Sequence, residues 1–410
     1  MKLSEDQMKH VLKPGVTLLS DIFKRNGFEI RVAGGAVRDL LMDIIPTDLD
    51  FATPATPDEM KQIFEKEEIR MINRGGEKHG TITARIEEEN FECTTLRVDK
   101  VTDGRHAEVQ FIRDWELDAG RRDLTINALF LGLDGTVYDY FDGIEHLKNR
   151  KVTFVGDPDK RIKEDYLRIL RYYRFFGRIA MNPSAHDPEI ISSIMNNCEG
   201  LGKISGERIW IEVKKIVQGR YGGELVQKMV ECKVGPQIGL PHYYDCENLI
   251  KVSKQFENFQ SKDSCFHPCT LLASGFTSEQ DAIHFTDRIK CSNKEKDILM
   301  YIVRNRDSYS NIKSIKLIQD LLVDMVYKDK KSKDLSVFLA SELVKYVGRE
   351  DLLSEISIDL IPLFPIKGGM LVNKVKNKKH IQAETRKLLD IWKRSDFTLG
   401  TKELLNELEP

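Results

Sequence analysis

The spacing of apolar residues changes near the middle of this 410-residue chain, and the change limits the folds available to it. Up to about residue 140, short runs rich in β-branched and aromatic residues alternate with turn residues, as in FEIRVA, TITARI and HAEVQFI. Such runs predict strands. Beyond about residue 150, apolar residues recur at helical spacing, as in EDYLRILRYYRFFGRI and AETRKLLDIWKRS. We therefore predict an α+β fold, with a mixed sheet first and only helices afterwards.

Composition sets further bounds. A chain of 410 residues with 41% apolar residues is long enough for two to four domains. Its seven cysteines lack paired spacing, which predicts free thiols. No run of 18 apolar residues occurs, so we expect no membrane partner. The net charge of −2 means that any nucleic acid must be held by a local basic patch.

Two carboxylates stand two residues apart in TDLDFAT. In a strand, Asp48 and Asp50 would project from one face while Leu49 and Phe51 enter the core. Like charges on one face favour a cation between them, and Mg²⁺ prefers carboxylate oxygens together with substrate phosphates. Taken alone, the pair also fits two solvated acids on an edge strand.

A glycine turn precedes these acids. Gly34 and Gly35 follow the apolar run RVA, and the helical pattern AVRDLLMD comes next. A helix N-terminus offers free N–H groups to phosphate, and Arg38 lies one turn into that helix. Glu92, in the strand pattern FECTTLR, supplies a third acid on the solvent side of its strand. Three acids on neighbouring strands would hold two metal ions about 3.5–4 Å apart.

Two further motifs carry paired charges. In AGRRDLTINALF, Arg121 and Arg122 suit a triphosphate, and Asp123 suits a ribose hydroxyl; an exposed charged loop is the alternative.

In EDYLRILRYYRF, Asp165 and Arg168 are spaced i and i+3 on one predicted helical face, followed by Arg171 and Arg174. An acceptor beside a donor matches the edge that cytosine and adenine share, whereas uracil and guanine reverse it. The alternative is a solvated salt bridge.

The order of these motifs resembles a known family. GGAVRD, DLD, RRDLTINA, YDYFDGIEHLKNR and EDYLRILRYYRF occur as in class II CCA-adding enzymes, members of the polymerase-β-type nucleotidyltransferase superfamily, over residues 30–178. The resemblance is strongest to the animal and other eukaryotic members. Such enzymes add C, C and A to the 3′ end of tRNA from CTP and ATP without a nucleic-acid template.

The resemblance implies roles for the motif residues. Asp48, Asp50 and Glu92 would be catalytic and bind two Mg²⁺ ions, and the nucleotide would be bound by Gly34, Gly35, Arg38, Arg121, Arg122, Asp123, Asp165, Arg168, Arg171 and Arg174. Residues 98–113, with Asp103 and Arg105, match a loop involved in switching from C to A; a plain β-connection is equally consistent with the sequence.

The resemblance also implies an organisation in four parts. We expect a nucleotidyltransferase head over 1–145, a helical neck over 146–220, a helical body over 221–275 and a tail over 276–410 that binds the tRNA elbow. The best basic tracks for tRNA are 327–334 and 373–394. A monomer and a homodimer both remain open. Family members in animals serve mitochondrial and cytoplasmic tRNA, and the N-terminus MKLSEDQMKH is not a recognisable targeting segment.

Two other functions remain open. A poly(A) polymerase of bacterial type has a similar head, and a catalytically inactive RNA-binding relative would keep the fold without the chemistry. The acids at 48, 50 and 92 argue against the second.

Overall fold

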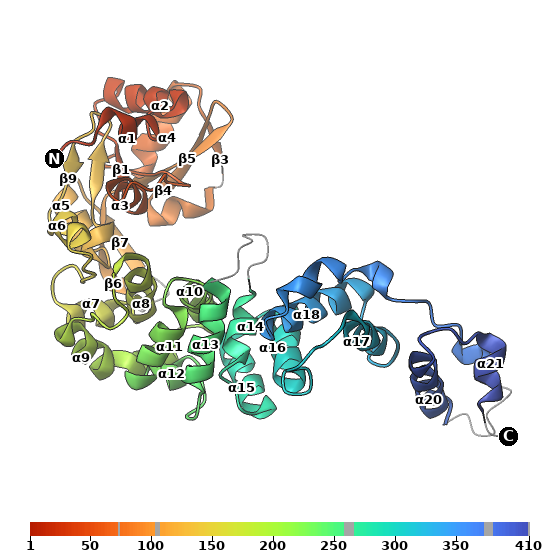
Figure 1. Cartoon of the computed structure of the whole chain (residues 1–410). Coiled ribbons are helices and arrows are strands. Elements are labelled where there is room, and N and C mark those ends of the chain that lie inside the picture. The colour runs from red at the N-terminus through yellow and green to blue at the C-terminus, as the bar shows by residue number, and fades with distance from the viewer. Residues whose placement is uncertain (73, 103–106, 258–265, 373–379, 409–410) are drawn as a thin grey trace. The chain divides into compact units, whose positions relative to one another are not determined.

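A computed structural model describes residues 1–72, 74–102, 107–257, 266–372 and 380–408 (Figure 1). The chain divides into two compact units. Unit 1 comprises Met1–His242 with Arg288–Lys290, and unit 2 comprises Tyr243–Asp287 with Cys291–Pro410.

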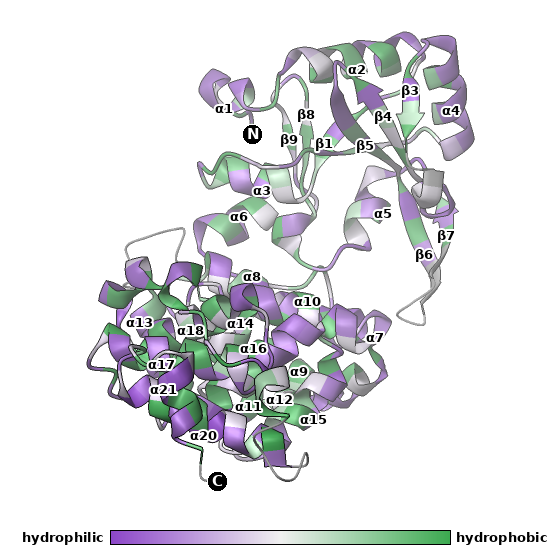
Figure 2. Ribbon diagram, turned by 90° about the vertical axis from the view of Figure 1, so that its right-hand side faces the viewer, coloured by the Kyte–Doolittle hydropathy of each residue, from purple (hydrophilic) through white to green (hydrophobic). Residues whose placement is uncertain are grey.

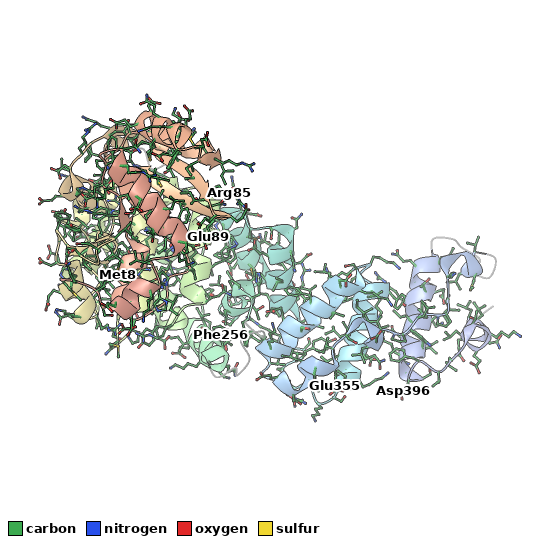
Figure 3. The ribbon with its side chains drawn as sticks, turned by 90° about the horizontal axis from the view of Figure 1, so that it is seen from above. Met8, Arg85, Glu89, Phe256, Glu355 and Asp396 are labelled. Atoms are coloured by element: carbon green, nitrogen blue, oxygen red, sulfur yellow. The ribbon has the colours of Figure 1, made fainter. Side chains whose placement is uncertain are left out.

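Unit 1 begins with a mixed sheet. In the described residues, seven strands lie in the order β3-β4-β5-β2-β1-β8-β9; β2 and β5 are parallel, and the other neighbours are antiparallel. Strands β6 and β7 form a separate antiparallel pair. The strands are β1 Arg31–Ala33, β2 Asp50–Thr53, β3 Arg70–Ile72, β4 Thr81–Ile86, β5 Glu89–Thr95, β6 Arg97–Thr102, β7 Ala107–Phe111, β8 Phe130–Gly132 and β9 Val137–Tyr138. Arg85 and Glu89 mark the turn end of the β4–β5 hairpin in Figure 3.

Short helices accompany the sheet. They are α1 Glu5–Lys9, α2 Pro14–Arg25, α3 Gly35–Leu41, α4 Pro57–Lys66 and α5 Trp115–Gly120, with 3-10 turns η1 Arg74–His79 and η2 Thr125–Asn127. The start of α4 is fixed by a capping box between Thr56 and Glu59 and by Pro57 in its first turn. Helices α2 and α4 pack together through Phe23 and Phe64, whose ring centroids are 5.7 Å apart.

The two faces of the sheet have different roles. Phe51 of β2 and Phe91 of β5 meet in the core with ring centroids 5.9 Å apart. Because side chains alternate along a strand, Asp50 and Glu92 must emerge on the opposite face. On the same face as Asp50 lies a buried cluster that is rich in alanine, namely Ala33, Ala52, Leu96, Ala119, Ala128, Phe130 and Val155. Its small side chains leave room for α5, which contributes Ala119, to pack against the sheet.

The rest of unit 1 is helical. Its helices are α6 Gly143–Lys148, α7 Pro158–Glu164, α8 Leu167–Ile179, α9 Pro188–Asn197, η3 Cys198–Lys203, α10 Gly206–Val217, α11 Gly222–Glu231 and α12 Val234–Gln237. In Figure 2 hydrophilic and hydrophobic segments alternate along these helices, as expected for amphipathic helices around a shared core. The largest contacts here join α8 to α10 and α7 to α9.

Unit 2 consists of helices in the described residues. They are α13 Cys246–Glu257, α14 Pro268–Ala273, α15 Glu279–Ile289, whose last residues count with unit 1, α16 Asn293–Asn305, α17 Ile315–Tyr327, α18 Lys333–Tyr346, η5 Glu350–Glu355, η6 Ile358–Leu360, α19 Gly368–Leu371, α20 Ile381–Arg394 and α21 Thr401–Asn406. Leu388, Leu389 and Trp392 of α20 are buried in a core that includes Phe364 and Leu404. No described helix has the length and apolarity that a membrane crossing requires.

The predicted α+β architecture is confirmed, with strands in the first part and helices after it. Two features differ from the sequence prediction. Strands β3 and β6 were not expected from their charged sequences. The helix expected from Glu164 onward is interrupted at Asp165, where the backbone is extended (φ −152°, ψ 105°), and α8 begins at Leu167. The six cysteines in the described residues are free. The four-part division stays a prediction.

Candidate active site

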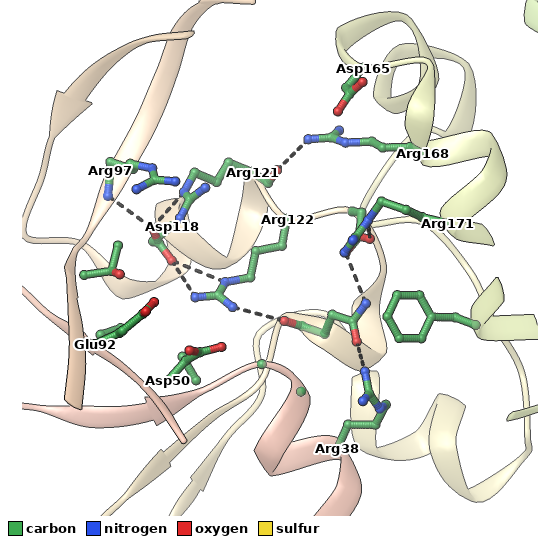
Figure 4. A pocket seen from close by; sticks show the side chains of 18 of the residues that line it. Arg38, Asp50, Glu92, Arg97, Asp118, Arg121, Arg122, Asp165, Arg168 and Arg171 are labelled. Carbon is green, nitrogen blue, oxygen red and sulfur yellow. Dashed lines mark hydrogen bonds and ion pairs between the residues drawn. The ribbon is translucent and has the colours of Figure 1, made fainter. Parts of the chain in front are cut away.

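A cleft of about 600 Å³ opens on the sheet face that bears Asp50 and Glu92 (Figure 4). Strands β1, β2 and β5, helices α3 and α5, and helix α8 supply its walls. Eight arginines line it: Arg38, Arg97, Arg121, Arg122, Arg168, Arg171, Arg174 and Arg178. Six carboxylates line it as well: Asp50, Glu92, Asp99, Asp118, Asp123 and Asp165. The surplus of cations suits a polyanionic ligand.

The glycine turn lies between β1 and α3, as predicted. Gly34 has φ 67°, a conformation that side chains disfavour. A Cβ there would lie 3.0 Å from Nη1 of Arg122 and 3.4 Å from the carbonyl oxygen of Asn127. Glycine therefore lets the 121–127 segment approach the end of β1.

Asp50 and Glu92 are direct neighbours. The parallel register of β2 and β5 pairs these two residues, and both line the cleft. The expectation for Asp48 was wrong in its geometry, because β2 begins at Asp50 and Asp48 lies in the preceding loop. Asp48 is exposed, and its carboxylate accepts a hydrogen bond from the Thr47 hydroxyl at 3.2 Å.

The surroundings of Asp50 favour a bound cation. Partial burial and then the negative charge of Asp48 raise the pKa of Asp50 above its usual value, and Arg122 opposes them only in part. Within the described residues no three His, Cys, Asp or Glu side chains are already arranged as a metal-binding group, and metal binding by all three acids stays a prediction. Two carboxylates nevertheless fit Mg²⁺, which usually takes one or two of them together with substrate phosphates and water.

Asp118 of α5 holds two arginines at once. Its Oδ1 accepts a hydrogen bond from Nε of Arg121 at 2.8 Å, and its Oδ2 accepts one from Nη2 of Arg122 at 3.2 Å. It also accepts the backbone N–H of Arg97 at 3.1 Å. Burial opposes ionisation of Asp118, but the charges of Arg121 and Arg122 outweigh it and hold its pKa below the usual value. Both guanidinium groups are thereby fixed toward the cleft.

Asp123, the predicted acceptor for a ribose hydroxyl, already accepts hydrogen bonds from protein groups. Its Oδ2 accepts a hydrogen bond from Nε of Arg171 at 2.6 Å, and its Oδ1 accepts one from the Asn127 amide at 3.2 Å. Burial opposes the charge of Asp123, and Arg171 outweighs it, so its pKa is lowered. The Leu124 N–H also donates to this carboxylate, which leaves one of its four lone pairs for a hydroxyl of the ligand.

The structure corrects the predicted pair of Asp165 and Arg168. Asp165 precedes α8 rather than lying on it; its carboxylate accepts the Leu167 N–H at 3.1 Å and Nη2 of Arg208 at 3.0 Å. The Arg168 guanidinium donates to Glu164 at 2.9 Å and to the Arg121 carbonyl oxygen at 2.9 Å. The two side chains are therefore held separately, yet both line the cleft.

The remaining arginines of α8 surround one aromatic ring. Arg174 donates to both carboxylate oxygens of the buried Glu212, at 3.0 and 2.9 Å. The Phe175 ring lies 4.3 Å from the Arg174 guanidinium, 5.5 Å from that of Arg171 and 4.9 Å from that of Arg38. The ring thus spaces three cations along one wall.

Sequence reasoning missed the residues that hold the predicted ones in place, namely Asp118, Asn127, Glu164, Phe175, Arg208 and Glu212. Two signals were present: Asp118 stands three and four residues before the arginine pair, and Arg208 and Glu212 share a face of the pattern GERIWIEV. Arg97 was also missed; burial lowers its pKa to about 10. Asp103 and Arg105 lie outside the described residues.

The chain is similar to proteins of known activity. A model described as Poly A polymerase head domain matches residues 30–153, and one described as Probable RNA and SrmB- binding site of polymerase A matches 186–240. The human and zebrafish (Danio rerio) proteins named CCA tRNA nucleotidyltransferase 1, mitochondrial, are 45% and 46% identical to it; each match covers 100% of this chain and 93% of the relative.

Solved structures share the fold. The Bacillus stearothermophilus CCA-adding enzyme in complex with CTP matches with a TM-score of 0.74 and 21% identity, over 96% of this chain and 97% of that one. The Thermotoga maritima CCA-adding enzyme complexed with tRNA matches with a TM-score of 0.64 and 19% identity, over 99% and 98%.

Asp118→Asn will separate the arginine pair from its anchor. We expect the KM for nucleotide to rise about 10- to 100-fold, because removing one partner of a buried ion pair costs several kcal/mol. The matched control is Glu116→Gln, an exposed acid on the same helix. Steady-state kinetics and urea unfolding at several pH values provide the measurements.

The pH dependence of that variant has a fixed sign. The pKa of Asp118 is lower in the folded protein than in the unfolded chain, where it is near 4. The ionised carboxylate therefore stabilises the fold fully above pH 4, and this contribution is lost as the pH falls through the folded-state pKa. The stability gap between wild type and Asp118→Asn should therefore narrow in acid. A gap independent of pH would show that Asp118 does not act through its charge.

Proposed function

The chain belongs to the CCA tRNA nucleotidyltransferase family, and from that premise we propose how its cleft adds C, C and A to the 3′ end of tRNA from CTP and ATP. One observation carries the proposal. The carboxylate neighbours Asp50 and Glu92 share one arginine-lined cleft with Asp165 and Arg168, so acids suited to phosphoryl chemistry and groups suited to a base edge face the same ligand space.

The triphosphate would be bound by Arg121 and Arg122. Asp118 already fixes both guanidinium groups, so little side-chain entropy is lost when phosphate oxygens replace water. Gly34 and Gly35 form the floor of this part of the cleft, and Arg38 lies beside them. Asp123 would accept a ribose hydroxyl, and Arg171 and Arg174 would complete the cationic wall.

Asp50 and Glu92 would hold Mg²⁺, with Asp48 as the nearby third acid whose charge already acts on Asp50. Magnesium bound there would supply the positive charge that in-line nucleotidyl transfer requires at the attacking 3′-hydroxyl and at the departing pyrophosphate. The chain's own side chains position both reactants and balance their charge. No residue of the cleft needs to act as a covalent nucleophile.

The base would be selected by Asp165 and Arg168. Arg208 and the Leu167 N–H restrain the Asp165 carboxylate, which stays an acceptor for an exocyclic amino group. Glu164 and the Arg121 carbonyl restrain the Arg168 guanidinium, which would donate to a ring nitrogen or carbonyl oxygen. Cytosine and adenine offer both groups, whereas uracil and guanine would oppose Asp165 with a carbonyl oxygen. The protein thereby replaces a template strand.

The tRNA itself would also contact unit 2. The basic track predicted over 373–394 is only partly available: 373–379 lie outside the described residues, Trp392 is buried, and Lys393 donates to Asp324 at 2.7 Å. Arg386, Lys387 and Arg394 remain exposed on α20 and would contact tRNA phosphates. The mitochondrial names of the animal relatives lead us to propose a mitochondrial site of action, with cytoplasmic tRNA as a second substrate pool.

Incubation of the protein with tRNA lacking its terminal CCA, Mg²⁺ and all four nucleoside triphosphates tests this function. We expect three added nucleotides in the order C, C, A, read by sequencing the extended 3′ ends. Tailing with adenosine alone would instead support a poly(A) polymerase, whose head the matching domain model also describes. No extension under any condition would support an inactive RNA-binding relative.

Asp165→Ala should keep triphosphate binding but lose base selection. We expect the preference for CTP over UTP to fall about 10- to 100-fold, because one base-edge contact is worth about 1–3 kcal/mol. Single-turnover incorporation measures the ratio. Lys163→Gln, which removes an exposed ion pair with Asp159 on α7, is the matched control. An unchanged ratio in Asp165→Ala would refute base reading by this carboxylate.

A further inference from the structure

Asp39 links two parts of unit 1 without facing the cleft. It is buried on α3, at 9% exposure, and is not among the residues that line the cleft. Its Oδ1 accepts a hydrogen bond from Nε of Arg38 at 3.0 Å, and its Oδ2 accepts one from Nη2 of Arg178 at 2.9 Å. Arg178 belongs to α8, so this single carboxylate joins the helix after the glycine turn to the helix that follows Asp165.

The contacts continue from Arg38 to a second point on α8. Nη1 of Arg38 donates to the Asn127 side-chain oxygen at 2.5 Å, and the Asn127 amide donates to Asp123 at 3.2 Å. Asp123 in turn accepts from Nε of Arg171, which lies on α8. We call the chain Arg178, Asp39, Arg38, Asn127, Asp123 and Arg171 the bridging network.

The bridging network begins and ends on one helix. Arg171 and Arg178 are seven residues apart, so they lie two turns apart on the same face of α8. The four residues between them come from the α3 and 123–127 segments and are all buried, at 4% (Arg38), 9% (Asp39), 7% (Asp123) and 7% (Asn127). Charge-assisted hydrogen bonds shielded from water resist displacement more than surface pairs do.

We infer that Asp39 is a positioning residue for nucleotidyl transfer: through Arg178 it fixes α8, which carries the nucleotide-binding arginines, against the sheet that carries the carboxylates. The inference rests on the proposed function. The ligand must touch Asp50 and Arg168 at once, and a displacement of about 1 Å between them costs up to about a hundredfold in rate. Breaking the contact should therefore slow transfer and weaken base selection together.

Arg178→Gln is the first test variant. The Arg178 side chain is 44% exposed, and Asp39 keeps its partner Arg38 when Arg178 is removed, so the fold should persist. We expect kcat for C addition to fall about tenfold and the CTP-to-UTP preference to fall at least fivefold. Arg178→Lys, which keeps the charge, should recover most of both. Arg25→Gln, which removes the surface ion pair with Glu67, is the matched control.

A double-mutant cycle separates positioning from general destabilisation. In the Asp39→Asn background, Arg178→Gln should change kcat less than twofold, because the contact is already lost. If the single variants instead lower kcat by weakening the fold, the two reductions in kcat will multiply in the double variant, and kcat will fall together with the melting temperature. The inference would be overturned if the kcat effects of Asp39→Asn and Arg178→Gln multiplied in the double variant. It would also be overturned if Arg178→Gln left both kcat and the CTP-to-UTP preference unchanged.

Hydrogen exchange of the ligand-free protein gives a readout that does not need activity. Arg178→Gln should speed amide exchange in residues 123–128, at the far end of the bridging network, while Arg25→Gln should not. Unchanged exchange there would contradict the network. If the wild type adds no nucleotide to tRNA, the proposed function fails, and the exchange data still decide whether Asp39 couples the two segments.

Discussion

The guanidinium groups around the cleft are held mainly by buried and half-buried carboxylates, and the site depends on this charge balance. The carboxylates come from different elements: Asp39 from α3, Asp118 from α5, Glu164 from α7 and Glu212 from α10. The pairings of Asp39, Glu164 and Glu212 fix one helix against another, whereas those of Asp118 fix the arginines that directly follow α5. Ala33 of β1, Ala52 of β2 and Ala119 of α5 permit this arrangement, since larger side chains at these positions would hold α5 away from the two strands.

The same balance explains how the cleft is prepared for its ligand. The arginines that would meet phosphate are already oriented, so binding does not have to order them. Asp50 is the exception, because partial burial and Asp48 disfavour its charge. A cation that binds together with the nucleotide would stabilise this negative charge. The arginines are thus oriented before the ligand binds, whereas the charge of Asp50 is stabilised only when a cation binds.

The sequence predicted the type of fold and the glycine turn, because both depend on short-range patterns. The residues that the family resemblance implied line the cleft with the exception of Asp48. The prediction failed where long-range contacts decide the geometry. The helical spacing of Asp165 and Arg168 suggested one continuous face, but Asp165 instead lies between α7 and α8, where it accepts the Leu167 N–H and pairs with Arg208 from a helix more than 40 residues later. The alternation in TDLDFAT suggested one strand, but pairing with β5 begins only at Asp50. Neither partner can be read from local spacing.

The central claim is that Asp50 and Glu92 jointly bind the metal that serves nucleotidyl transfer. Titration of Mn²⁺ into the protein with CTP present, followed by electron paramagnetic resonance, measures this most directly. The account predicts that Asp50→Asn and Glu92→Gln each weaken Mn²⁺ binding at least about tenfold while CTP still binds. Mn²⁺ affinity equal to that of the wild type in both variants would contradict it.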